Sequence, residues 1–304
     1  MLAVVNTPNG KDLVEIREVA EPQPAANQAL VEVRAFSLNR GELRLFQIRP
    51  EGWRPGQDIS GVVIQPAADG TGPKAGERIV ALTDNAGWAE RAAVPAHRMA
   101  ALPDNVLIEE AAALPVAGLT ALRTLRQGAP LLGKRVLITG AAGGVGHLAT
   151  QIATRSGARV TAVVGRPERG RHLRGADEIV EGIDKVRGNF ALILEAAGGS
   201  SLTAAIARVE AKGTIVVFGN SSGEATPFSF RDLAEHPNAR IQGFSYFTSE
   251  AEERFAPDLA LLVALVADGS LKPYIVEHSW RELAQIGPLL RDRQIRGKAL
   301  FGID

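Results

Sequence analysis

The chain opens with short apolar runs separated by turn-forming residues. Four of these runs predict strands, at residues 29–38, 59–67, 77–83 and 88–95. Gly, Pro and Asn lie between them, as in PNGK, ADGTGPKAG and DNAGW. Strands at this spacing, with no helical pattern between them, predict a small barrel or sandwich.

The pattern changes near residue 109, where helical and strand-like segments begin to alternate. Residues 109–127 are typical of a helix, with Pro115 as a break or a first-turn residue. Strands are predicted at residues 135–140, 159–165, 177–181, 190–198, 214–220 and 239–247. Helices are predicted at residues 147–157, 168–175, 201–213 and 257–269. Apolar strands joined by helices predict a parallel sheet that is covered on both faces.

The stretch ITGAAGGVG, residues 138–146, joins one predicted strand to the next helix. Such a turn presents backbone N–H groups at a helix N-terminus, where they and the helix dipole bind a pyrophosphate. The glycine spacing fits the dinucleotide fingerprint with Ala in its first position, whereas a tight turn alone requires fewer glycines. In this fingerprint Gly143 lets the backbone approach the phosphates, and Gly146 lets the helix pack on the strand. The cofactor-binding residues expected here are Gly140, Ala141, Ala142, Gly143, Gly144, Val145 and Gly146.

The end of the second strand indicates which dinucleotide to expect. NAD sites carry an acidic residue there, but this chain has Gly165 and Arg166, followed by Arg169. Because basic side chains suit a 2′-phosphate, we predict NADPH, bound in part by these three residues. Two alternatives stay open: the arginines belong to a solvated helix start, or Glu168 binds a ribose.

The composition of the chain excludes several classes of binding partner and of metal site. The 34 Lys and Arg balance the 34 Asp and Glu and form no basic run, so we expect no nucleic-acid partner. No apolar run is long enough to span a bilayer, and the N-terminus has no secretory pattern. We therefore expect a cytoplasmic protein without a membrane partner. The chain has no cysteine, which excludes disulfides and thiolate metal sites.

A series of motifs runs through the whole chain. They are AFSLNRGELRLFQ (35–47), RPGQDISGVV (54–63), AAALPVAGLTALRTL (111–125), GKRVLITGAAGGVGHLATQIA (133–153) and GKALF (297–301). In this order they resemble the medium-chain dehydrogenase/reductase superfamily, in its zinc-independent quinone oxidoreductase (zeta-crystallin-like) branch.

The resemblance implies an α/β protein of two domains. A GroES-like β-barrel catalytic domain would comprise residues 1–113 and 255–304. A Rossmann NADP-binding domain, with a doubly wound parallel sheet, would comprise residues 114–254. The site would lie in the cleft between the two domains.

The resemblance also implies roles for single residues. Asn39 matches an Asn beside the nicotinamide and is the expected catalytic residue, with an amide that donates to a substrate oxygen or holds the cofactor ribose. Glu42 stands where the family often has Asp, so a proton role for it is left open. The structural alternatives are that Asn39 is only a turn residue, that Thr120 bonds the carbonyl four residues earlier in its helix, and that Phe244 belongs to the core. Further cofactor contacts are implied for Thr120, Phe218, Gly219, Asn220, Phe244 and Ser245.

Zinc-dependent members of this superfamily use cysteines and the His of a GHE segment. That segment is Gly56-Gln57-Asp58 here, and a metal needs several converging ligands. We therefore expect no metal, and we expect each histidine to lie at the surface or to cap an element. The five histidines are His97, His147, His172, His236 and His278.

The function implied is hydride transfer from NADPH to a small-molecule substrate, a quinone or an unsaturated carbonyl. One alternative is an enoyl or enone reductase, which reduces a carbon–carbon double bond. Another is an NADPH-binding module with little catalysis, because a fold alone does not define a function. The resemblance further implies a homodimer joined at the edges of the Rossmann sheets, with residues 214–230 at that edge.

Overall fold

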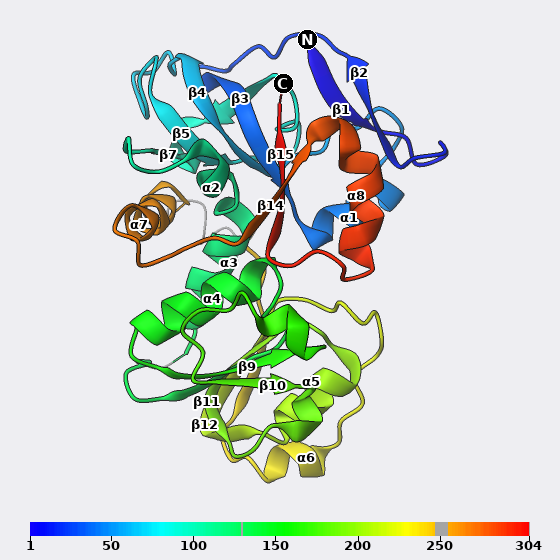
Figure 1. The fold of residues 1–304 in the computed structure, drawn as a ribbon, viewed down its shortest axis with the longest axis vertical. Helices are drawn as coiled ribbons and strands as arrows, with labels where there is room; N and C mark the ends of the chain where they lie inside the picture. The colour runs from blue at the N-terminus through cyan, green and yellow to red at the C-terminus, as the bar shows by residue number, and fades with distance from the viewer. Residues whose placement is uncertain (129, 247–254, 304) are drawn as a thin grey trace. The chain divides into compact units, whose positions relative to one another are not determined.

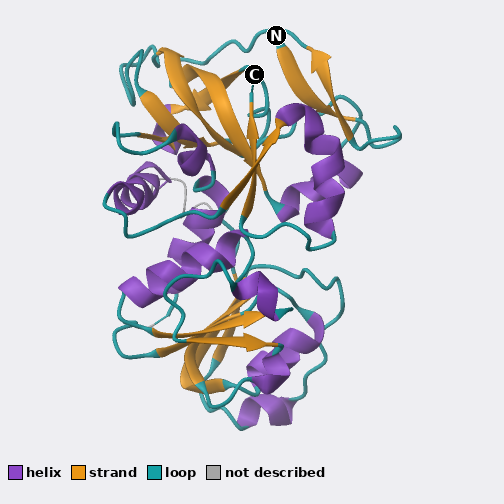
Figure 2. Cartoon of the chain, viewed as in Figure 1, coloured by secondary structure: helices purple, strands orange, loops and turns teal. Residues whose placement is uncertain are grey.

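The computed structural model describes residues 1–128, 130–246 and 255–303 (Figures 1 and 2). They form two units: residues 1–119 with the described part of 247–304, and Thr120–Tyr246. The boundary falls inside helix α3 (Pro115–Arg126). Each unit has its own sheet and its own hydrophobic core.

The first unit is built on a sheet that the C-terminal segment completes. Its strands lie in the order β14-β15-β3-β4-β5-β7, and β6 also pairs with β3. Only β14 and β15 run parallel among these described pairs. Figure 1 shows the red strand β15 beside the blue β3. The bounds are β3 (Gln28–Leu38), β4 (Asp58–Gln65), β5 (Arg78–Leu82), β6 (Arg91–Pro95), β7 (Met99–Ala101), β14 (Ile275–Ser279) and β15 (Lys298–Gly302).

Aromatic side chains from distant segments form the core of this unit. The ring centroid of Phe36 lies 4.9 Å from that of Trp88 and 5.2 Å from that of Phe301. Phe46 meets Trp88 edge-on, and all four side chains are buried. The burial of four large aromatic side chains stabilises a core strongly. Because Phe301 lies in β15, the core of this unit depends on its C-terminal strand.

Short elements surround this sheet. Strands β1 (Leu2–Asn6) and β2 (Val14–Glu18) form an antiparallel pair of their own. Helix α1 (Arg40–Ile48) contacts α8 (Leu283–Arg291). The other elements are η1 (Ala96–Arg98), α2 (Ile108–Ala112), α7 (Phe255–Ala267) and η5 (Trp280–Glu282).

The second unit contains a fully parallel sheet. Its strands lie in the order β10-β9-β8-β11-β12-β13, which is 3-2-1-4-5-6 in chain order, as in dinucleotide-binding sheets. The bounds are β8 (Arg135–Ile138), β9 (Arg159–Val164), β10 (Glu178–Glu181), β11 (Phe190–Glu195), β12 (Val209–Val217) and β13 (Arg240–Gly243).

The helices of the second unit show where the strand order reverses. Helix α4 (Gly144–Arg155) contacts β8 and β9, whereas α5 (Gly199–Ile206) contacts β11 and β12. The chain moves along the sheet in opposite directions in these two crossovers, and right-handed crossovers then place the helices on opposite faces. Ligands of such sheets bind outside the carboxyl ends of the strands at this reversal, here β8 and β11. The remaining elements are η2 (Pro167–Gly170), η3 (Ile183–Lys185) and α6 (Phe230–Ala234).

The structure confirms the predicted fold class and most predicted strands, and it corrects several helices. The helix predicted at residues 201–213 ends at Ile206, because Val209 pairs with Phe190 and begins β12. Strand pairing there overrides a local helical pattern. The helix predicted at residues 168–175 is only the 3₁₀ turn η2, and α4 begins at Gly144 rather than at residue 147. Strand β13 ends at Gly243, and residue 247 of the strand predicted there lies outside the described residues.

Replacing Gly61 with Ala should destabilise the first unit. A Cβ on Gly61 of β4 would overlap the carbonyl oxygen of Glu32 on β3, because the two backbones approach closely. We expect Gly61→Ala to lower the free energy of unfolding by about 1–3 kcal/mol, as measured by urea denaturation. Gly302→Ala is the control, because Gly302 also lies in a strand and a Cβ there meets nothing within 4 Å. Equal stability of the two variants would contradict this account of β4.

Candidate active site

The glycine-rich turn lies at the carboxyl end of β8, directly before α4. Gly143 is the N-cap of this helix, so the N–H groups of Gly144, Val145 and Gly146 belong to its first turn. These groups have no carbonyl one turn earlier within the helix to which they can bond. They form a set of backbone donors at the positive end of the helix dipole.

Glycine stands at positions 143 and 146 of this turn for different physical reasons. A Cβ on Gly146 would lie 2.5 Å from both the Cα of Ala141 and the carbonyl oxygen of Gly140, so close packing requires glycine there. A Cβ on Gly143 would meet only the carbonyl oxygen of Gly140, at 3.3 Å. That contact with a backbone oxygen is already tight, so a side chain at position 143 would require a small shift of the turn, and a ligand approaching the backbone would add to the crowding.

A buried carboxylate holds the ends of β8 and β11 together. Glu195 is fully buried and accepts hydrogen bonds from the hydroxyls of Thr139, at 3.0 Å, and Ser201, at 2.8 Å. The N–H groups of Ala197 and Gly198 also donate to it, at 3.1 and 2.8 Å. These bonds fix the turn after β11 beside the glycine-rich turn. Glu195 was not predicted as a site residue, although an acidic residue at the end of an apolar strand was a visible signal.

The loop after β12 packs on the same turn. The N–H of Ser221 donates to the carbonyl oxygen of Ala196 at 3.1 Å, and a Cβ on Gly219 would lie 2.9 Å from that oxygen. A Cβ on Gly140 would lie 3.5 Å from the Cβ of Ala196. Ala196 therefore lies between Gly140 and Gly219, and the predicted Asn220 follows on the same exposed loop.

The remaining predicted cofactor residues lie at neighbouring strand ends or in α3. Gly165 and Arg166 are exposed after β9, and Arg169 is half-buried in η2. The N–H of Phe244 donates to the carbonyl oxygen of Val217 at 2.8 Å, which places it at the end of β13. The other side chains differ in exposure: Phe218 and Phe244 are half-buried, Asn220 and Ser245 are exposed, and Thr120 is buried in α3.

A second polar cluster lies in the first unit, around Asn39. Asn39 is half-buried, follows β3 and is the N-cap of α1. Its backbone N–H donates to Glu42 Oε2 at 2.9 Å, as in a capping box. Its side-chain Nδ2 donates to Asp58 Oδ2 at 2.8 Å and to Glu42 Oε2 at 3.3 Å. The amide of Asn39 is therefore engaged within its own unit.

Asp58 and Lys298 form the buried centre of this cluster. The Nζ atom of Lys298 lies 3.0 Å from Asp58 Oδ2, and both side chains are almost completely inaccessible to solvent. Asp58 also accepts from the hydroxyl of Ser37 and from the N–H of Val116, each at 2.8 Å. A buried ion pair needs such additional donors to offset the cost of removing it from water.

Glu42 is a fully buried carboxyl next to the ion pair of Asp58 and Lys298. Burial raises its pKa to about 8, and the negative charge of Asp58 adds to the shift. The hydrogen bonds from Asn39 and the charge of Lys298 oppose the shift without cancelling it. Glu42 is therefore mainly protonated near neutral pH in the folded protein.

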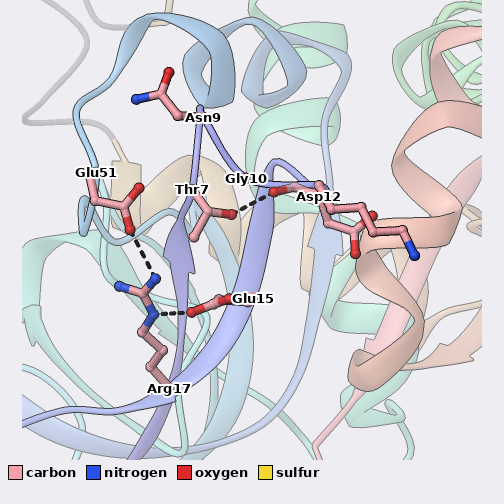
Figure 3. A pocket seen from close by; sticks show the side chains of 8 residues that line it. Thr7, Asn9, Gly10, Asp12, Glu15, Arg17 and Glu51 are labelled. Atoms are coloured by element: carbon pink, nitrogen blue, oxygen red, sulfur yellow. Dashed lines mark hydrogen bonds and ion pairs between the residues drawn. The ribbon is translucent and has the colours of Figure 1, made fainter.

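A surface pocket near β2 lies apart from these clusters (Figure 3). Arg17 points between two carboxylates there, and its Nη2 atom lies 2.9 Å from Glu51 while its Nε atom bonds Glu15. The guanidinium is thus already paired, and no predicted site residue lines the pocket. Its lining residues are Thr7, Asn9, Gly10, Lys11, Asp12, Glu15, Arg17 and Glu51.

The acidic residues and histidines of the described segments do not gather into a metal cluster. Within residues 1–128, 130–246 and 255–303, no three His, Cys, Asp or Glu side chains converge as a metal site. No helix in the described part of the chain is long and apolar enough to cross a membrane. His147, which was expected at the surface or as a capping residue, is buried, and its Nδ1 lies 2.9 Å from the carbonyl oxygen of Gly143, the N-cap of α4.

Comparison with known proteins places this architecture in a class of two-domain dehydrogenases. The family of the alcohol dehydrogenase GroES-like domain matches residues 25–104, and the zinc-binding dehydrogenase family matches residues 144–264. These two matches, in this order, make the chain similar to the medium-chain dehydrogenase/reductase superfamily, and the relatives below support its quinone oxidoreductase branch.

Individual relatives agree with this assignment. A chloroplast envelope quinone oxidoreductase homolog of Arabidopsis thaliana is 36% identical over 54% of this chain and 55% of that protein. The chain thus matches about half the length of that relative. The Homo sapiens quinone oxidoreductase is 29% identical over 88% of this chain and 86% of that protein. The fold matches that of the Escherichia coli quinone oxidoreductase, solved with NADPH, with a TM-score of 0.87, 21% identity and full coverage of both chains.

The raised pKa of Glu42 should make stability fall as the pH rises. A carboxyl that holds its proton more tightly when folded stabilises the fold fully below its unfolded value of 4.5. That contribution is lost progressively up to the folded pKa of about 8. Between pH 5 and 8 we expect the free energy of unfolding of the native chain to fall, relative to Glu42→Gln, by on the order of a few kcal/mol.

Urea denaturation at several pH values measures this difference. Glu109→Gln is the control, because Glu109 also lies in the first turn of a helix, α2, but is exposed. The native chain and Glu109→Gln should share one pH dependence. A pH dependence of Glu42→Gln parallel to that of the native chain would show that Glu42 keeps an ordinary pKa.

Proposed function

We propose that this protein is an NADPH-dependent oxidoreductase that reduces a quinone, without a catalytic metal. The observation that carries the proposal is the glycine-rich turn of backbone donors where the strand order of the parallel sheet reverses. The homologous quinone oxidoreductases support the choice of reaction. We assign residues 114–254 to cofactor binding and residues 1–113 and 255–304 to the catalytic domain.

The second unit offers the groups for the cofactor. The N–H groups of Gly144, Val145 and Gly146 suit a pyrophosphate, and the missing side chain of Gly143 lets it approach the backbone. When bound, NADPH supplies the hydride, which converts a quinone to a hydroquinone with a proton from solvent. The protein would contribute binding, orientation and exclusion of water. The residues that we assign to the cofactor are Thr120, Gly140, Ala141, Ala142, Gly143, Gly144, Val145, Gly146, Gly165, Arg166, Arg169, Phe218, Gly219, Asn220, Phe244 and Ser245.

Preference for NADPH over NADH is proposed from the end of β9. Gly165 and Arg166 stand where an acidic residue would bind a ribose, and Arg169 follows in η2. Arginine suits a phosphate because its guanidinium can donate two parallel hydrogen bonds.

The absence of a catalytic metal is proposed from residue chemistry. The chain has no cysteine, and the segment Gly56-Gln57-Asp58 has no histidine. Asp58 is already bonded to Lys298 and to its other donors. The carbonyl would instead be oriented by a hydrogen bond, and Asn39 is the residue that we assign to this role.

A homodimer is part of the proposal. Residues 214–217, which were expected at the sheet edge, lie instead in β12 between β11 and β13. Strand β13 is an edge of the parallel sheet, and its Ile241 is 37% exposed. Phe228 and Phe230, in the preceding segment, are 54% and 85% exposed. An exposed apolar edge of this kind is suited to pairing with a second copy. The cytoplasmic location expected from the sequence stays a prediction.

Gly165→Asp should shift the cofactor preference toward NADH. Gly165 is exposed, and a Cβ there meets nothing within 4 Å, so the chain has room for the new side chain. The added carboxylate repels a 2′-phosphate and can bond ribose hydroxyls. We expect the ratio of kcat/KM for NADPH over NADH to fall by about tenfold or more, or roughly 1.4 kcal/mol. Gly165→Asn, of equal size without the charge, should change the ratio much less. An unchanged ratio in both variants would show that the 2′-phosphate does not bind beside Gly165.

The choice of acceptor is tested by NADPH consumption with an ortho-quinone and with a crotonyl thioester. We expect turnover of the quinone and none of the thioester. Turnover of the thioester alone would instead identify an enoyl reductase. Tight NADPH binding without turnover of either would favour the binding module.

Asn39→Ala tests the proposed catalytic residue in the same assay. Loss of one donor to a developing negative charge should lower kcat by about tenfold or more. Asn27→Ala, at an exposed position in the same unit, is the control and should keep full turnover. Full turnover by Asn39→Ala as well would exclude the assigned role.

A further inference from the structure

Lys298 holds the side-chain oxygen of Asn39 from the far end of the chain. Its ammonium donates to Asn39 Oδ1 at 2.5 Å, to Asp58 Oδ2 at 3.0 Å and to the carbonyl oxygen of Leu38 at 3.3 Å. An ammonium has three N–H donors, so all of them are used. Lys298 is therefore not available to donate to a substrate, and its role is to act on its neighbours.

The pairing of β15 with β3 brings these groups together. Ala299 lies opposite Leu38 in the antiparallel register, which places Lys298 beside Asn39 although 259 residues separate them. Lys298 is 2% exposed, so its side chain has little freedom to leave this position. The contact is thus built into the sheet and does not depend on a flexible surface side chain.

These contacts determine which way the Asn39 amide faces. The amide of an Asn side chain can turn by 180° about its Cβ–Cγ bond, which exchanges the positions of its oxygen and nitrogen. Here a turned amide would direct its NH₂ group at the ammonium of Lys298. It would also direct its oxygen at the carboxylate of Asp58, which now accepts from its Nδ2 atom at 2.8 Å. Both changes replace attraction by repulsion, so one orientation is strongly favoured.

The two N–H bonds of Asn39 Nδ2 are unequal. The bond to Asp58 is short, at 2.8 Å, whereas the contact with Glu42 is 3.3 Å long. The same Glu42 oxygen already accepts the backbone N–H of Asn39 at 2.9 Å. The N–H that faces Glu42 is therefore the more weakly held of the two, and an acceptor oxygen can compete for it.

We propose that Lys298, together with Asp58, is a positioning residue that orients the Asn39 amide to donate to the acceptor oxygen. This inference rests on the proposed function, in which Asn39 orients the substrate carbonyl. A protein in which hydrophobic residues replace a buried ion pair is often as stable as the original. Stability alone therefore does not explain the pair of Asp58 and Lys298, and the proposal gives it a role in orienting Asn39.

A double-mutant cycle tests the proposal with NADPH and an ortho-quinone. The variants are Lys298→Met, Asn39→Ala and the double mutant. If Lys298 acts through Asn39, each single variant should lower kcat by about tenfold or more, and the double mutant should be no worse than Asn39→Ala. The Kd for NADPH should stay unchanged in all of them. Independent, multiplying losses would overturn the proposal, as would full turnover by Lys298→Met.

Arg98→Met is the matched control for removing a buried cation. Arg98 lies in the same unit, and its largely buried side chain bonds Asp84 at 2.6 Å. We expect this variant to lose stability but to keep its kcat. If Lys298→Met does not fold, Lys298→Gln replaces it, because Gln removes the charge but retains a polar end.

A second measurement needs no acceptor. In protein labelled with ¹⁵N-asparagine, the side-chain NH₂ signals of Asn39 are identified by their loss in Asn39→Ala. We expect slow exchange of these protons with solvent in the native chain and at least about tenfold faster exchange in Lys298→Met. Unchanged exchange would overturn the proposal. If the native chain reduced no acceptor, the proposed function would fail, while this measurement would still decide whether Lys298 orients the amide.

Discussion

Both units depend on one physical constraint: a carboxylate removed from water needs hydrogen-bond donors or a positive charge. Asp58 obtains the ammonium of Lys298 and the hydroxyl of Ser37. Glu195 obtains the hydroxyl of Thr139 and the N–H groups of the turn after β11. Each carboxylate thereby gathers segments that are distant in the sequence, at the places where we propose function.

The two clusters differ in what they leave for a ligand. In the first unit the polar groups mainly satisfy one another, so Asn39 is held in place by Asp58, Glu42 and Lys298. In the second unit Glu195 is satisfied, but the first N–H groups of α4 are directed outward from the helix end. Rigid support beside N–H groups that have no partner within their helix reduces the entropy lost on binding, as expected of a site organised before its ligand arrives.

Local signals explain what could be predicted. The strands from β3 to β6 were predicted within a few residues because apolar runs between turn residues have few alternatives. Helix α1 was missed, although Asn39 followed three residues later by Glu42 is an N-terminal signature. Residues 209–213 were predicted as helix, but pairing with β11 makes them strand. His147 was expected at the surface or at a cap, and its burial could not be predicted because a single polar residue carries no local signal of burial.

The sequence by itself determined the sheet types, the glycine-rich turn and the missing acidic residue after β9. Each of these follows from backbone preferences or from the chemistry of a few adjacent residues. Only the tertiary structure decided that Lys298 bonds Asn39 and that Glu195 joins β8 to β11. Such contacts depend on strand order and register between distant segments, and burial then determines how strongly the charged groups interact. No spacing along the chain encodes that information.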